Sequence, residues 1–240
     1  MKLQSAIHFL FPPQCLCCGV ETTSDFALCG PCWRETTFVS GLVCDACGIP
    51  LPGDAIGQAE HCDACIIAPQ PWTKGRAAVM YEGSGRKMIL GLKHGDRLDL
   101  APSLADWMVD AAKDLPIAGA LVAPVPLFWR RFLRRRYNQS SLLAQKVARA
   151  KCADYCPDLF TRVRATRVQE GMTRAERQEN QRDAFAVNPR NTAKIFDRTV
   201  LLVDDVMTSG ATLAACSEAC FAAGAADVNV LVLARVARDT

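Results

Sequence analysis

Beyond about residue 70, short apolar runs alternate with longer segments in which apolar residues recur every three or four positions. The short runs predict buried strands, and the longer segments predict amphipathic helices, because 3.6 residues complete a helical turn. We expect strands at 77–82, 118–126, 199–205 and 227–236, and helices at 83–95, 100–115, 138–150 and 210–225. This alternation predicts an α/β fold in which a parallel sheet is flanked by helices.

Local features support three of these elements. The helix expected at 83–95 has an apolar face that should point into the core and that carries Met88, Ile89 and Leu92. Asn138 is a suitable N-cap for the third helix, because its side chain can accept a hydrogen bond from a free backbone N–H. The run at 199–205 has no polar alternation before its end, which favours a strand covered on both faces.

The first 70 residues follow a different pattern, which is dominated by cysteine. The chain has 13 cysteines, and nine of them lie between Cys15 and Cys65. Eight form four CxxC pairs: Cys15/Cys18, Cys29/Cys32, Cys44/Cys47 and Cys62/Cys65. A CxxC turn directs two thiolates toward one point, and a second pair completes a tetrahedral four-sulfur site suited to zinc.

We therefore predict two structural zinc sites, one in each half of this cysteine-rich region. The expected ligand sets are Cys15, Cys18, Cys29 and Cys32, and Cys44, Cys47, Cys62 and Cys65. Pairing of the first CxxC with the third, incomplete loading, a disulfide scaffold and a redox CxxC are the alternatives. Helical i, i+4 spacing makes four further cysteines core or surface thiols rather than ligands: Cys152, Cys156, Cys216 and Cys220.

These patterns predict two modules joined by a linker that Pro69 and Pro71 mark. Residues 1–68 would be a double zinc-ribbon module, in which bound metal supplies the folding energy that a small core cannot. It would begin with a short amphipathic helix whose apolar face carries Leu3, Ile7, Leu10 and Phe11. Residues 69–240 would form the α/β domain.

Charge is divided unevenly between the modules. Residues 1–70 carry two basic and seven acidic side chains, whereas the rest of the chain carries 26 basic and 18 acidic ones. This asymmetry suggests that the second module faces anionic partners. The apolar runs fall short of the roughly 18–20 residues that a membrane span needs. The N-terminus lacks the features of a secretory signal, so we expect a cytoplasmic protein with no membrane span.

The segment LLVDDVMTSGATL, residues 201–213, carries the second candidate site. A buried strand is expected to end at Asp204 and Asp205, which would face solvent, and a loop then leads into a helix. Ligands of open α/β sheets bind at the carboxyl ends of strands, and helix N-termini suit phosphate groups. The loop adds hydroxyl donors and a glycine that permits close backbone approach, through Thr208, Ser209, Gly210 and Thr212.

Two adjacent carboxylates would repel a phosphate, so they must serve another group. Sugar hydroxyls are suitable donors for them, either directly or through a divalent cation. A phosphorylated ribose meets both demands. The competing interpretations are weaker, because a receiver domain carries its aspartate pair at its start, and a Walker-type loop would need GxxxxGK[ST]. A plain strand followed by a capped helix explains neither the doubled aspartate nor the hydroxyls.

This segment resembles the phosphoribosyl pyrophosphate (PRPP) loop of type I phosphoribosyltransferases. Nearly the whole chain resembles the ComF family, also called GntX, which joins a double zinc ribbon to a domain of that type. The resemblance also covers LKHGD at 92–96, PVPLFWRRFLRRRYNQS at 124–140 and RATRVQEGMTRAERQENQRDAF at 164–185. One departure is Arg136, which stands where the family usually has glycine.

The resemblance implies a role for each motif. The two carboxylates would bind the ribose hydroxyls and the loop after them the 5′-phosphate, so that PRPP would contact Asp204, Asp205, Val206, Met207, Thr208, Ser209, Gly210, Ala211 and Thr212. Mg²⁺ would neutralise the pyrophosphate. Arginines after Pro126 and in a flexible lid at 164–185 would contact that pyrophosphate, among them Arg130, Arg135, Arg164 and Arg177. A merely solvated basic face is the alternative for each arginine.

The implied reaction is displacement of pyrophosphate from ribose C1 by a nitrogen nucleophile, as in a pentosyl transferase. Neither a catalytic base nor the acceptor can be identified from the residues. The family is also linked to DNA uptake and competence, which makes single-stranded DNA and a competence helicase-type protein candidate partners. A protein that senses PRPP without turnover is a third interpretation. The acidic cysteine module argues against that module as the DNA-contacting face.

Overall fold

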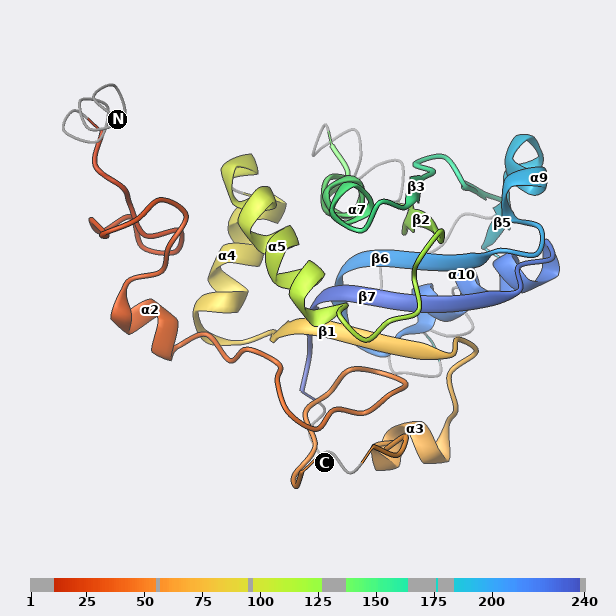
Figure 1. The fold of residues 1–240 in the computed structure, drawn as a ribbon, viewed down its shortest axis with the longest axis horizontal. Helices are drawn as coiled ribbons and strands as arrows, with labels where there is room; N and C mark the ends of the chain where they lie inside the picture. The colour runs from red at the N-terminus through yellow and green to blue at the C-terminus, as the bar shows by residue number, and fades with distance from the viewer. Residues whose placement is uncertain are drawn as a thin grey trace.

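A parallel β-sheet forms the centre of the computed structural model (Figure 1), which describes residues 11–54, 57–94, 97–126, 137–163, 176 and 184–237. Within these residues all neighbouring strands of the sheet are parallel. Their order is β1 (Lys74–Met80), β7 (Asp227–Arg235), β6 (Thr199–Met207), β2 (Leu121–Pro124) and β3 (Asp154–Tyr155). The predicted α/β fold with a parallel sheet is confirmed.

Four long helices accompany the strands in the predicted order: α4 (Gly83–His94), α5 (Ala101–Ala111), α7 (Gln139–Ala150) and α10 (Ala211–Ala222). The Asn138 side chain accepts a hydrogen bond from the Ser140 backbone N–H, which confirms it as the N-cap of α7. Helix α5 is shorter than the expected 100–115, because a 3-10 turn, η1 (Leu98–Leu100), precedes it and the helix ends at Ala111. The amphipathic helix expected at the N-terminus falls on residues 1–10, which lie outside the described residues.

Both faces of the sheet are buried, as the unbroken apolar run in β6 predicted. Successive side chains of a strand point to opposite faces. On one face Leu201 and Leu231 pack with α4, α5 and α7, and the predicted inward residues Met88, Ile89 and Leu92 belong to this core. On the other face Val200 and Val230 pack with α10, and three cysteines of the N-terminal module join them.

The structure adds short elements that the sequence pattern did not predict. An antiparallel pair forms between β4 (Phe160–Arg162) and β5 (Phe185–Val187), and η2 (Pro189–Asn191) and α9 (Thr192–Ile195) follow it. These elements, like β3, have two to four residues each, which is too short for a detectable period. None of the helices in the described ranges has the length and apolarity needed to cross a membrane.

The cysteine-rich region lies along the outer edge of the sheet, beside β1 (Figure 1). It contains two short helices, α2 (Gly30–Arg34) and α3 (Asp63–Ile67). The chain between its two halves pairs with the edge strand, since Val39 N–H donates to the Ala78 carbonyl at 3.0 Å and Met80 N–H donates to the Thr37 carbonyl at 2.8 Å. This pairing covers the exposed backbone groups of an edge strand.

Candidate functional site

The predicted phosphate-binding segment lies where β6 ends and α10 begins. Strand β6 runs to Met207, two residues beyond its expected end, and a short turn at 208–210, which we name the phosphate loop, leads into α10. Gly210 adopts the left-handed conformation with φ +81°, which favours glycine. A hollow of about 50 Å³ is lined by Asp204 and by residues 206–213. Eight of the nine residues predicted to bind PRPP therefore face one small cavity at a helix N-terminus.

The two aspartates are placed differently from our expectation. We expected both at a solvent-facing strand end, but they lie inside β6, where Asp205 is 9% exposed and Asp204 is half-buried. The expectation was wrong because β6 continues to pair with β7 as far as Met207. Asp204 therefore reaches the hollow from the sheet, whereas Asp205 does not line the hollow and pairs with Lys93.

Each carboxylate has a partner that the sequence did not reveal. Ser140, in the first turn of α7, donates its hydroxyl hydrogen to Asp204 Oδ1 at 2.8 Å. Lys93, near the end of α4, forms an ion pair with Asp205, with 3.0 Å between Nζ and Oδ1. The signals were present, since Lys93 lies in LKHGD and Ser140 closes the motif that ends in NQS, but neither motif indicates which partner it meets.

Burial and the adjacent charge of Asp205 raise the pKa of Asp204 to about 7, although Ser140 and Lys93 act in the opposite direction. Taking a carboxylate out of water penalises its charged form, and a like charge nearby adds to that penalty. Near neutral pH the protonated and the ionised form of Asp204 are therefore both populated. A group that donates hydrogen bonds or carries positive charge would drive this proton off.

A second positive charge lies beneath the phosphate loop. Arg235, at the end of β7, has no exposed surface, and its Nη1 donates to the carbonyls of Met207 at 2.9 Å, Thr208 at 2.7 Å and Val236 at 2.9 Å. Its Nε and Nη2 have no hydrogen-bond partner among the described residues. The sequence did not identify Arg235, because an arginine at the end of an apolar strand is expected to reach solvent rather than to be buried.

The predicted pyrophosphate-binding arginines cannot be placed in this site. Arg130 and Arg135 fall in 127–136, and Arg164 and Arg177 fall in 164–175 and 177–183, all outside the described residues. The neighbouring elements are described, and they bring α7 close to the aspartates. Asn138 donates its side-chain amide to the Val125 carbonyl at 3.2 Å, which connects the start of α7 to the end of β2.

The eight predicted zinc ligands form two tetrads in the order in which they occur in the chain. Cys15, Cys18, Cys29 and Cys32 form one, and Cys44, Cys47, Cys62 and Cys65 form the other; within each tetrad the sulfur atoms lie within 4.8 Å of one another. The interleaved alternative is therefore wrong, and the disulfide scaffold is also wrong, because all 13 cysteines are free in the structure.

The sulfur geometry fits zinc. The Sγ atoms of Cys18 and Cys29 are 3.7 Å apart, as are those of Cys47 and Cys62. A tetrahedral zinc with Zn–S bonds of about 2.3 Å requires sulfur–sulfur distances of roughly 3.8 Å. We name residues 15–32 the first ribbon and residues 44–65 the second ribbon. Both tetrads support structural zinc.

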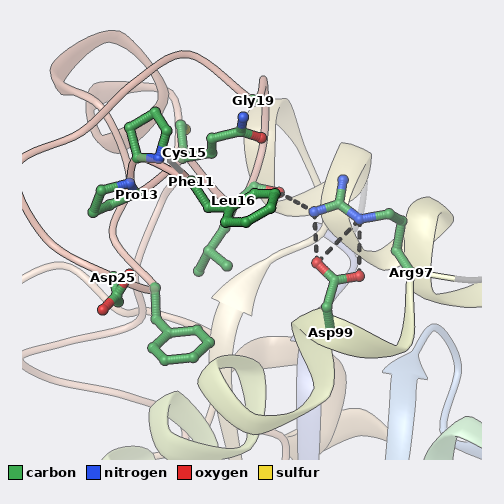
Figure 2. Close-up of a pocket in the computed structure, with 11 residues that line it drawn as sticks. Phe11, Pro13, Cys15, Leu16, Gly19, Asp25, Arg97 and Asp99 are labelled. Carbon is green, nitrogen blue, oxygen red and sulfur yellow. Dashed lines mark hydrogen bonds and ion pairs between the residues drawn. The ribbon is translucent and has the colours of Figure 1, made fainter. Parts of the chain in front are cut away.

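A cavity of about 590 Å³ lies beside the first ribbon and away from the aspartates (Figure 2). Arg97 on its wall is paired with Asp99 at 2.8 Å, and it also donates to the Leu16 carbonyl at 3.4 Å. In Figure 2 the guanidinium of Arg97 reaches both partners. Its charge thus connects the first ribbon to the turn before α5, and the cavity contains none of the predicted PRPP-binding residues.

Comparison with known proteins agrees with this arrangement. Residues 6–66 match the family described as double zinc ribbon domain, and residues 139–240 match the phosphoribosyl transferase domain. The DNA utilization protein YhgH of Salmonella typhimurium is 30% identical over 230 residues, which cover 93% of this chain and 97% of that protein. Competence protein F of Haemophilus influenzae is 29% identical over 214 residues, which cover 87% of this chain and 90% of that protein.

Among solved structures, an allosteric regulatory enzyme of purine biosynthesis aligns with 60% of this chain and 30% of its own at 17% identity and a TM-score of 0.39, which is too distant to inform the site. The sequence matches define the class as a double zinc ribbon joined to a phosphoribosyl transferase domain. The chain belongs to the ComF family, which includes proteins named for DNA utilization and for competence.

Proposed function

We propose that this protein binds PRPP at the carboxyl end of β6. The observation that carries the proposal is the pair Asp204 and Asp205 beside a helix N-terminal hollow lined by residues 206–213. The loop backbone and its hydroxyls would hold the 5′-phosphate, because α10 presents free N–H groups and the positive end of its dipole there. The carboxylates would accept hydrogen bonds from the ribose 2′ and 3′ hydroxyls.

The electrostatics of the carboxylates favour a ligand of this kind. Asp204 has a pKa raised to about 7, so it gains most from a partner that stabilises its ionised form. Mg²⁺ binds oxygen ligands and is commonly held by one or two carboxylates together with substrate phosphates. Asp204 and Asp205 fit that role when PRPP is bound. Lys93, now paired with Asp205, would then be available to an anionic oxygen of the ligand.

A reaction at this site would be displacement of pyrophosphate from ribose C1 by a nitrogen nucleophile. The described residues suit binding and orientation of PRPP, which supply much of the rate enhancement in such transfers. We propose that Arg130, Arg135, Arg164 and Arg177 contact the pyrophosphate. Arginine suits this task because its planar guanidinium binds phosphate oxygens in pairs.

The names of the relatives favour a role in DNA use as a second proposal. We propose that single-stranded DNA meets the basic segment at 127–136, with a competence helicase-type protein as the kind of partner. Free thiols arranged for zinc suit a reducing compartment such as the cytoplasm. DNA affinity measured across a salt series would fall steeply if this segment contacts phosphates, with a log–log slope near about −0.7 for each phosphate.

Calorimetric titration with PRPP, with and without Mg²⁺, tests the site directly. Asp204→Asn with Asp205→Asn should weaken PRPP binding by at least about 100-fold, because each charge-assisted acceptor contributes roughly 1.5–3 kcal/mol. Asp106→Asn with Asp110→Asn is the matched control, since it makes the same charge change on the exposed face of α5. Unchanged PRPP affinity in a folded Asp204/Asp205 double variant would refute the assignment.

Two further experiments distinguish a transferase from a PRPP sensor and test whether DNA and PRPP share a binding segment. Pyrophosphate release on addition of amine acceptors would indicate a transferase, whereas PRPP binding without release would indicate a sensor. Repeating the DNA titration with saturating PRPP and Mg²⁺ tests whether both ligands share the basic segment. DNA binding that PRPP leaves untouched would contradict a shared segment.

A further inference from the structure

Trp72, in the linker just before β1, contacts both the second ribbon and the phosphate loop. Its side chain is buried, with 4% of its surface exposed. The indole Nε1 donates to the Ala46 carbonyl at 2.5 Å, and Ala46 lies between the zinc ligands Cys44 and Cys47. A buried N–H that loses its acceptor costs free energy, so this hydrogen bond specifies where the indole lies relative to the tetrad.

The opposite edge of the same indole lies against the phosphate loop. A Cβ atom added to Gly210 would lie 3.0 Å from Trp72 Cη2, so the ring lies beside the space that a side chain at this position would occupy. Gly210 is also the loop residue with a φ of +81°, immediately before α10. A shift of the indole would therefore change the space available to the residue that shapes the phosphate-binding turn.

The second ribbon is held against β1 by direct backbone contact, which leaves it little freedom to move by itself. Gly75 N–H donates to the Asp45 carbonyl at 2.6 Å. A Cβ atom on Gly75 would lie 2.4 Å from the Ala46 carbonyl oxygen, and one on Gly48 would lie 2.8 Å from the Ala77 nitrogen. Only glycine permits such close approach. The position of Ala46 is therefore determined jointly by the tetrad and by the sheet.

Arg235 provides a second connection between the same two regions. Its Nη1 holds two carbonyls at the end of β6, as described above. The same guanidinium interacts electrostatically with Cys47, which belongs to the second tetrad. Four thiolates around zinc carry a net negative charge, which would stabilise this buried guanidinium.

We propose that the second ribbon is a support for the phosphate loop, and that Trp72 is the positioning residue that connects them. Zinc at Cys44, Cys47, Cys62 and Cys65 holds Ala46, Ala46 holds the indole, and the indole packs against Gly210. The inference rests on the proposed PRPP site and adds a structural requirement to it. Loss of this support should affect the part of the ligand that carries the 5′-phosphate.

Trp72→Phe is the decisive variant, because it removes the indole N–H and shortens the ring while leaving all eight cysteines in place. Titrations with PRPP, ribose 5-phosphate and pyrophosphate should be compared. We expect about tenfold weaker binding of the two 5′-phosphate ligands and pyrophosphate binding within about twofold of the wild type. Trp33→Phe is the matched control, since Trp33 lies in α2 next to the first tetrad and packs on Phe38.

The zinc requirement is tested by comparing one ligand from each tetrad. Cys62→Ser and Cys18→Ser should each leave one zinc per chain. Only Cys62→Ser should weaken PRPP binding, by about tenfold or more, because the first ribbon has no comparable contact with the phosphate loop among the described residues. Zinc content and thermal unfolding are measured on every variant, so that a folding defect is recognised as such.

The outcomes separate this inference from the proposed function. A folded Trp72→Phe protein with two zinc ions and unchanged PRPP affinity overturns the support but leaves the PRPP site standing. Equal weakening of all three ligands also overturns it, because that result indicates a general structural defect. If the wild-type protein binds no PRPP, both proposals fail together. Loss confined to the 5′-phosphate ligands supports the inference.

Discussion

The two ribbons have nearly the same sequence plan but occupy different environments. Each has a CxxCG turn followed by a CxxC pair at the start of a short helix. In the second ribbon Cys44, Cys47 and Cys65 are 0%, 1% and 3% exposed and belong to the core that β6, β7 and α10 share. In the first ribbon Cys15 and Cys32 are also buried, but Cys18 is exposed and Cys29 is half-buried, whereas the fourth ligand of the second ribbon, Cys62, is half-buried.

The difference comes from what each ribbon touches. The first ribbon contacts the domain through Leu16, whose side chain joins the core and whose carbonyl accepts a hydrogen bond from Arg97, and the aromatic series Trp33, Phe38 and Trp107 follows it. The second ribbon lies against the backbone of β1, where Gly75 leaves room for it. The same motif therefore packs into two different cores, through Leu16 in the first copy and through Cys44, Cys47 and Cys65 in the second.

The largest expected difference between the ribbons is in their zinc dependence. Cys44→Ser with Cys47→Ser should lower the unfolding temperature of the whole protein, because bound zinc contributes folding free energy and this tetrad lies in the shared core. Cys15→Ser with Cys18→Ser should leave a folded phosphoribosyl transferase domain with one zinc. Thermal unfolding and zinc analysis of both variants measure this. Equal destabilisation by the two variants would contradict the comparison.

A smaller effect is expected for the charged groups that hold each ribbon. Arg76, in β1, is buried and pairs with Asp45 at 2.6 Å and with Asp114. Arg76→Met should destabilise the protein by about 3 kcal/mol, since it leaves the half-buried Asp45 without its partner. Arg97→Met, which removes the more exposed pair beside the first ribbon, should cost about 1 kcal/mol or less.

Urea unfolding of the two arginine variants measures these costs. Asp114 adds a pH signature, because hydrogen bonds from Arg76 outweigh the opposing effect of burial and lower its pKa. The stabilisation from this pair is present above the ordinary aspartate pKa and is lost as the pH falls through the lowered value. Similar unfolding free energies for Arg76→Met and Arg97→Met would contradict the difference between the ribbons.

A pH-dependent effect on stability is expected near the phosphate loop. The pKa of Asp204 is raised to about 7 in the folded protein, whereas an unfolded aspartate ionises near about 3.9. The folded state therefore binds more protons between these values, and stability should fall as the pH rises from about 4 to about 7. Asp204→Asn removes this loss of stability, so the unfolding free energy of the variant should exceed that of the wild type by most near pH 8.

Thermal unfolding of the wild type and of Asp204→Asn across this pH range measures the effect, with Asp110→Asn as an exposed control. The result also sharpens the comparison of the ribbons. Because the second ribbon shares a core with β6, Asp204→Asn should slow zinc removal by a chelator from the second tetrad at pH 8 and not from the first. If the difference in thermal stability between Asp204→Asn and the wild type does not change with pH, the raised pKa of Asp204 is contradicted.

The local pattern of the sequence determined the elements and the chemistry of the sites. The period of the apolar residues and the capping residues were sufficient to predict α4, α7, α10 and the main strands, because these features act within a few residues. The CxxC spacing was sufficient to predict the two cysteine tetrads. The doubled aspartate before a hydroxyl-rich turn indicated the hollow at the start of α10, and its role as a PRPP site stays a prediction. The boundary at 68/69 stays a prediction, since the second ribbon packs into the core of the following domain.

The partners of those groups were decided only by the tertiary structure. Ser140 lies 64 residues from Asp204, and the Trp72 indole meets an acceptor 26 residues away. No local pattern encodes such contacts, because they depend on which strand edge and which helix N-terminus the sheet order brings together. The same reason explains why β6 extends past Asp205. Its last residues pair with β7, and the hydrogen-bonded ladder, rather than the local sequence, determines where a strand ends.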